Sequence, residues 1–149
     1  GVPVIAERAM WWPGTPSPAA WQEAHNAPGN TRTATRWMLA DCEVGGPRAV
    51  DTYLLVANTS DTASLVHVTL FFEDGTTVER AFDVAARSRF NVHVASEFPS
   101  ATGRRFSALV RSLGASPAEI VVERAVYSDE NGVLWAAGAN SLGTPLAVR

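Results

Sequence analysis

The chain has 149 residues, of which 46% are hydrophobic and 18% are charged, and its formal net charge is −3. This length predicts a single ordinary domain, which buries roughly two-thirds of the surface that its unfolded chain exposes. A mildly acidic chain without clustered cations argues against nucleic acid as a partner. No apolar run approaches the roughly 18 residues of a membrane span, so the chain is not expected to cross a membrane.

Strand signals run from about position 35 to the end of the chain. The expected strands are rich in β-branched and aromatic residues or alternate apolar and polar residues, and they span 50–58, 64–73, 76–84, 87–95, 105–111, 120–127 and 133–138. Asn131-Gly132 joins the last two and is a strong hairpin signal. Short strands separated by turn residues predict an all-β fold, an antiparallel immunoglobulin-like β-sandwich preceded by an irregular Trp- and Pro-rich N-terminal segment.

Segment 4–11 repeats the pattern of segment 120–127. Both run through three apolar residues, then Glu, Arg and Ala, then an apolar and an aromatic residue. The match continues, after a short slip in alignment, from segment 21–29 to segment 135–143, which share a Trp, an Asn and a Gly in order. We therefore expect an internal duplication, in which residues 1–34 are a strand and loop resembling the tail of a preceding repeat and residues 35–149 are the sandwich module.

Segment 120–127 is largely apolar on both faces, which is typical of a strand in the middle of a sheet. The leading segment has the same pattern, so it too is expected to bury both sides, and the assembly role considered below depends on that burial. The charged residues of both copies are expected to find partners, because unpaired buried charges are costly; the alternative is a strand edge in contact with water. The residues expected to carry structure or assembly are Val4, Ile5, Glu7, Arg8, Met10, Trp11, Glu123 and Arg124.

An ordered set of motifs resembles an uncharacterised bacterial repeat module of large secreted or surface proteins. Units of that module carry ERAMYW, a Gly-His-Asn-like loop, TYLLLANP and SRFTVNV segments in this order. The matching residues here are Glu7–Trp12, Ala24-His25-Asn26, Trp37–Ala40, Thr52–Asn58, Ser88–Val92 and Val121–Ala125. The resemblance implies an extracellular or cell-surface β-rich module, and it brings no catalytic residues with it. The second copy departs from the first, with Ala139 in place of His25.

The sequence offers little for catalysis, metal binding or a cofactor. A zinc site needs three or four converging ligands, and the three histidines, His25, His67 and His93, lack such spacing. Glu7 and Glu123 are each followed by Arg, which favours structural pairing over acid–base work on a glycosidic bond. We therefore expect no enzyme activity, no metal and no cofactor.

Two functions remain. The favoured one is an extracellular structural or assembly module, a building block of a surface filament or a tandem array, in which the leading strand adds to the sheet of a neighbouring subunit or repeat. The alternative is a carbohydrate-binding β-sandwich module for a cell-surface glycan, since exposed Trp rings can stack on sugars. Its candidate ligand-binding residues are Trp11, Trp12, Trp21, His25 and Asn26.

Overall fold

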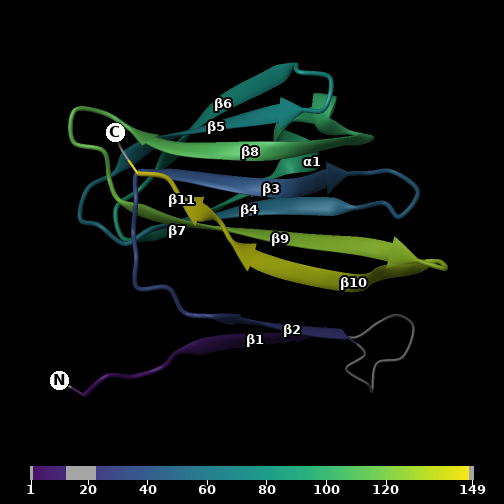
Figure 1. Ribbon diagram of the computed structural model, residues 1–149, viewed down its shortest axis with the longest axis horizontal. Coiled ribbons are helices and arrows are strands. Elements are labelled where there is room, and N and C mark those ends of the chain that lie inside the picture. Colours follow the sequence, from purple (N-terminus) through teal and green to yellow (C-terminus); the bar gives the residue numbers. More distant parts are fainter. Residues whose placement is uncertain (1, 13–22, 148–149) are drawn as a thin grey trace.

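The computed structural model describes residues 2–12 and 23–147 as two antiparallel sheets packed face to face, with a separate two-stranded sheet beside them (Figure 1). One large sheet has the order β10-β9-β4-β7 and the other β11-β3-β8-β5-β6. The predicted all-β antiparallel sandwich is therefore confirmed, and its immunoglobulin-like detail stays a prediction. Within the described residues, no helix is long and apolar enough to cross a bilayer.

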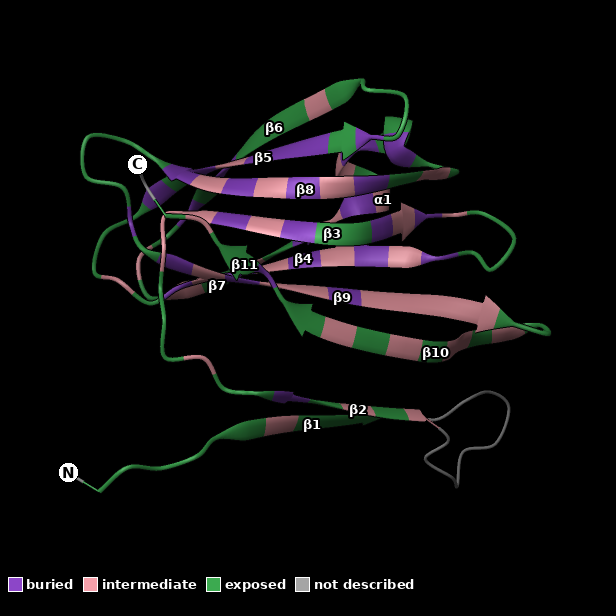
Figure 2. Cartoon of the chain, in the orientation of Figure 1, coloured by how far each residue is buried: buried purple, intermediate pink, exposed green. Residues whose placement is uncertain are grey.

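From β3 onward the chain crosses repeatedly between the two large sheets, while β5 and β6 stay in one sheet and β9 and β10 in the other. Their bounds are β1 Glu7–Trp12, β2 Glu23–Pro28, β3 Arg36–Val44, β4 Asp51–Asn58, β5 Ser64–Phe72, β6 Thr77–Val84, β7 Ser88–His93, α1 Val94–Glu97, the 3-10 turn Pro99–Ala101, β8 Arg104–Leu113, β9 Ile120–Glu130, β10 Val133–Leu142 and β11 Thr144–Pro145. The two sheets bury their facing sides, since alternate residues of β4 and β8 are buried (Figure 2). The apolar/polar alternation in the sequence thus sets which side of each strand meets the core.

Strand β9 lies between β4 and β10, as its two-faced pattern predicted. Ile120 and Val122 point into the sandwich and have no exposed surface, while Ala125 is buried on the other side of the sheet. Trp37, at the start of β3, is also fully buried, and its indole Nε1 donates to the carbonyl oxygen of Ile120 at 2.9 Å. The beginning of β9 is therefore fixed to both sheets.

Strand β3 carries a bulge that the sequence did not predict. Its register with β8 shifts between Leu39 and Cys42, and Asp41 has a φ of 57°. A bulge turns carbonyl groups out of the ladder, and these need another donor. Arg124 of β9 supplies it, donating to the carbonyl oxygens of Ala40, at 2.6 Å, and Asp41.

The expected burial of the leading strand is wrong for this chain. Val4 and Ile5 precede β1 and are 87% and 94% exposed, and Trp11 is 58% exposed. The expected partner for Glu7 is also absent among the described residues, because its side chain lies on the solvent side of the strand. The physical reason is that the hairpin lays only one face on the four-stranded sheet, and within the described residues nothing covers its other face or the segment ahead of β1.

Candidate functional site

The N-terminal hairpin, which we define as residues 6–12 and 23–29, is the part of the molecule that stands apart from the sandwich. Strands β1 and β2 pair antiparallel from Glu7↔Pro28 to Trp12↔Glu23, and the amide of Gly29 closes the ladder by donating to the carbonyl of Ala6 at 2.7 Å. The hairpin lies against the outer side of the four-stranded sheet, with β2 nearest β10 (Figure 1). Segment 23–28 was expected to be irregular, and it is a strand because β1 supplies its ladder.

Aromatic rings hold the hairpin to the sheet. The indole Nε1 of Trp12 donates to the carbonyl of Trp135 at 2.8 Å. The Trp12 ring meets Tyr127 edge-on, with centroids 5.5 Å apart, and Tyr127 stacks on Trp135 at 4.7 Å. A Cβ on Gly138 would lie 2.7 Å from the Tyr127 ring and 2.8 Å from the Trp12 ring, so only glycine leaves room for both rings. Trp12 is therefore the main anchor of the hairpin.

The polar contacts of the docked hairpin are less complete. Arg8 forms an ion pair with Glu123, with 3.1 Å between Nη2 and Oε2. Burial lowers the pKa of His25 below its usual 6.5, and the nearby Arg8 charge lowers it further, while Glu123 opposes the shift. Among the described residues, neither ring nitrogen of His25 nor the side-chain amide of Asn140 has a hydrogen-bond partner. Each such group costs about 1–3 kcal/mol, which weakens the docking.

A cavity of about 220 Å³ remains between the hairpin and the sheet. Its lining includes Met10, His25, Tyr53, Arg89 and Trp135. The hairpin therefore does not pack against the sheet at core density, in agreement with its incomplete hydrogen bonding.

The N-terminal hairpin has the same register as the hairpin formed by β9 and β10. The first pairs Arg8↔Ala27, Ala9↔Asn26, Met10↔His25 and Trp11↔Ala24, and the second pairs Arg124↔Ser141, Ala125↔Asn140, Val126↔Ala139 and Tyr127↔Gly138. These are the residues that the internal sequence match aligns. The closing hydrogen bond recurs as well, because Gly143 donates to the carbonyl of Val122 at 2.9 Å, as Gly29 does to that of Ala6.

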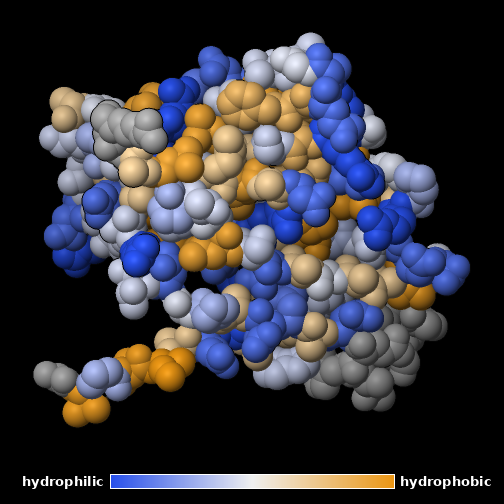
Figure 3. Space-filling model, viewed as in Figure 1, coloured by the Kyte–Doolittle hydropathy of each residue, from blue (hydrophilic) through white to orange (hydrophobic). Residues whose placement is uncertain are grey.

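The two hairpins differ in what lies along their first strand. The second edge of β9 pairs with β4 from Ile120 to Tyr127. The second edge of β1 has no partner within residues 2–12 and 23–147. Ahead of β1, the apolar tail extends away from the body of the molecule (Figure 3). An open edge with an apolar end is a template for pairing with another strand.

The residues considered for glycan binding do not lie on one surface. Trp11 and Asn26 are on the outward side of the hairpin, and Asn26 is exposed. Trp12 and His25 are on the inward side, with ring centroids 5.4 Å apart. Trp21 lies outside the described residues. The geometry therefore gathers no sugar-stacking platform from this set.

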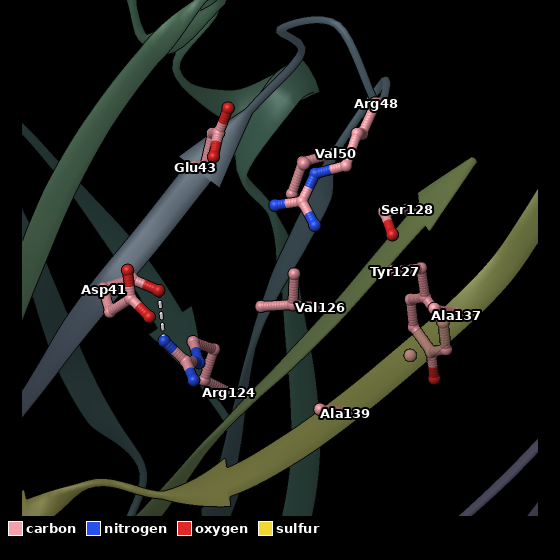
Figure 4. A pocket seen from close by; sticks show the side chains of 11 residues that line it. Asp41, Glu43, Arg48, Val50, Arg124, Val126, Tyr127, Ser128, Ala137 and Ala139 are labelled. Carbon is pink, nitrogen blue, oxygen red and sulfur yellow. Dashed lines mark hydrogen bonds between the residues drawn. The ribbon is translucent and has the colours of Figure 1, made fainter. Parts of the chain in front are cut away.

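A second cavity, of about 290 Å³, opens between β3 and the inner side of β9 and β10 (Figure 4). Two acidic residues, Asp41 and Glu43, and two basic residues, Arg48 and Arg124, line it. Arg124 points at Asp41 and is held by backbone carbonyls there. The charges balance, and the guanidinium of Arg124 already has a structural task in joining β9 to the bulge.

One side-chain cluster has the residue types of a hydrolase triad. His93 lies between Asp51, at 2.7 Å from Nε2, and Ser96, at 2.7 Å from Nδ1. Tyr53 stacks on the imidazole at 4.7 Å and donates to Asp51 at 2.9 Å. Ser96 is exposed, and neither it nor His93 lines the two cavities described above. The cluster joins β4 to the start of α1.

The remaining chemistry-bearing groups are also structural. Burial raises the pKa of the Cys42 thiol to about 11, so it stays protonated at neutral pH. Among the described residues, no group of three His, Cys, Asp or Glu side chains could hold a metal ion. The docking surface made by Tyr127, Trp135 and Gly138 was not identified from the sequence, where Trp135 and Gly138 served only to align the two copies.

Comparison with known proteins gives a fold and no activity. No family model matches the sequence, and no curated protein matches it. The crystal structure of Thermotoga maritima 1070 superposes with a TM-score of 0.65 at 15% identity, over 78% of this chain and 97% of that one. The Anabaena sensory rhodopsin transducer superposes with a TM-score of 0.51 at 21% identity, over 64% of this chain and 86% of that one. At these identities the likeness concerns the fold alone.

Proposed function

We propose that this chain is an extracellular structural module, a building block of a surface filament or a tandem array, and that neighbouring units join by strand addition. The observation that carries the proposal is the N-terminal hairpin, which copies β9 and β10 in register and leaves one edge of β1 open. The partners are then copies of the same module, either as separate subunits or as adjacent repeats. The motif resemblance supports the surface location.

The burial on which the assembly role was expected to depend is not found, so the proposal rests instead on the open edge of β1 and on the register of the hairpin. In the isolated chain, Val4 and Ile5 lie in water, which is unfavourable for large apolar side chains. A second strand paired with β1 would bury them and satisfy its free backbone groups. A head-to-tail contact of this kind extends into a filament or an array where successive rotations do not close a ring.

The test is the size of the protein in solution and its appearance by electron microscopy. We expect mass to rise with concentration and regular polymers to form. Val4→Asp with Ile5→Asp abolishes both, because charges then occupy the added strand. Val2→Asp is the matched control: Val2 is equally exposed but precedes the duplicated segment, so this variant assembles normally. A chain that stays monomeric at every concentration, or a control that fails alongside the double variant, refutes the proposal.

The carbohydrate-binding alternative has weaker support. Four of its candidate residues divide between two faces of the hairpin, as described above. A glycan array, with Trp11 changed to Ala as control, distinguishes the two roles: specific binding that is lost in the variant favours the carbohydrate role, and its absence favours assembly.

A further inference from the structure

We infer that the N-terminal hairpin completes the sandwich of a preceding unit in a tandem array, a unit without its own β9 and β10, and takes there the position that β9 and β10 occupy here. The inference rests on the proposed function and adds the site, the register and a competing position. It follows from four observations on the two hairpins.

The first observation is the register, which transfers directly. In this sandwich β4 pairs with β9 through Leu55↔Glu123, Leu54↔Arg124, Tyr53↔Ala125 and Thr52↔Val126. Replacing each β9 residue by its counterpart in β1 gives the contacts of the joined units: Leu55↔Glu7, Leu54↔Arg8, Tyr53↔Ala9 and Thr52↔Met10. The open edge of β1 thereby gains a complete ladder, and nothing in the hairpin itself has to change.

The second observation concerns apolar surface. Ile120 and Val122, at the start of β9, have no exposed surface. Val4 is the counterpart of Ile120, and it is 87% exposed here. In the position of β9 this side chain would enter the core between the sheets. The sequence match therefore aligns an exposed apolar segment, which contains Val4, with a fully buried one, which contains Ile120.

The third observation concerns the arginine. Arg124 reaches the carbonyl groups of Ala40 and Asp41 at the β3 bulge. Arg8 is its counterpart and would reach the same bulge in the partner unit. In the present position Arg8 meets Glu123 instead, and its Nε has no hydrogen-bond partner within the described residues. The bulge is thus an acceptor site that fits the arginine of either hairpin.

The fourth observation is that the two positions exclude each other. The side of β1 that carries Arg8, Met10 and Trp12 faces the outer side of its own four-stranded sheet. The corresponding side of β9, with Arg124 and Val126, faces the interior of the sandwich. One surface cannot cover both, so the hairpin must leave its own sheet before it completes another unit. The docked arrangement is therefore a competing, self-capped state.

A strand graft tests the position of the hairpin. Residues 120–127 are replaced by residues 4–11, which have the same length and keep the native loop after β9. The graft is expected to unfold in one cooperative transition in urea, followed by tryptophan fluorescence and near-ultraviolet circular dichroism. The matched control replaces the same residues by 5–12, which shifts the register by one and turns the apolar set to the other side. The control is expected to lose the cooperative transition.

The outcomes separate this inference from the proposed function. Loss of cooperative folding in the in-register graft, or equal behaviour of graft and control, overturns the inference even if the native chain forms polymers. Gly138→Ala tests the docked position in the native chain, because the new Cβ would collide with the rings of Tyr127 and Trp12 and release the hairpin. The hairpin amides are then expected to lose their protection from hydrogen exchange, while those of β3 and β8 keep theirs. Unchanged protection of the hairpin overturns the docked position.

Discussion

Replacing Trp12 by Ala should release the N-terminal hairpin and leave the sandwich intact. The change removes the hydrogen bond from Nε1 to the carbonyl of Trp135, which contributes about 1 kcal/mol. It also removes the edge-on contacts with Tyr127 and His25, which contribute about 0.5–1.5 kcal/mol each. Docking therefore weakens by about 2–4 kcal/mol, or about 30- to 700-fold in the equilibrium between docked and free hairpin.

Amide hydrogen exchange measures this equilibrium. A two-stranded hairpin alone is marginal in water, so a released hairpin loses protection. The amide of Gly29, which bonds to the carbonyl of Ala6, should exchange faster by about the factor that docking loses, about 30- to 700-fold. Trp11→Ala is the control, since Trp11 lies on the solvent side and should leave exchange unchanged. Equal exchange rates in the two variants would show that Trp12 does not anchor the hairpin.

Three more outcomes follow from groups described above. The pKa of Cys42 is raised to about 11, so its alkylation at pH 8 should be slow and proceed no faster than the chain unfolds. Rapid labelling of the folded chain, measured by mass spectrometry, would contradict this. Arg124→Met should lower stability by about 1.5–3 kcal/mol in urea, because the bulge carbonyls of Ala40 and Asp41 lose a charged donor; an unchanged midpoint would show that water replaces it. Docking of the hairpin should weaken as pH falls through 6.5, because the docked state lowers the pKa of His25 and protonation therefore favours the free hairpin. The protection of the hairpin amides from hydrogen exchange at pH 5.5 and 7.5 measures this. A pH dependence that survives His25→Ala has another origin.

The sandwich could be predicted because its strands carry their own burial pattern. Segments such as 64–73 and 120–127 show which sides are apolar, and the structure pairs them as β5 and β9. Strand β2 could not be predicted, since Ala24, Asn26 and Pro28 are poor strand formers and the strand depends on pairing with β1. The bulge at Asp41 was missed for a similar reason: it is set by the contact with β9 and leaves no local signal.

The candidate site was predicted in part. The internal match aligned segments 4–11 and 21–29 with segments 120–127 and 135–143, but it did not predict that the first two segments form a hairpin. It also led us to expect partners for Arg8 and Glu123, which the structure pairs with each other. The burial of Val4 and Ile5 could not be predicted correctly, because periodicity shows which sides are apolar and says nothing about whether the same chain holds a surface to cover them. The anchoring role of Trp12 also depends on Gly138, whose importance lies only in the space that it leaves.

The way the chain enters and leaves the sandwich has a mechanical consequence. It enters β3 at Arg36 and leaves after β11, and the amide of Leu146 donates to the carbonyl of Arg36 at 2.9 Å. Tension along a tandem array of such units would act at this junction and break the few hydrogen bonds between β11 and β3 one after another. The rest of each sandwich would not bear this force. The junction would therefore open at low force and release a long length of chain.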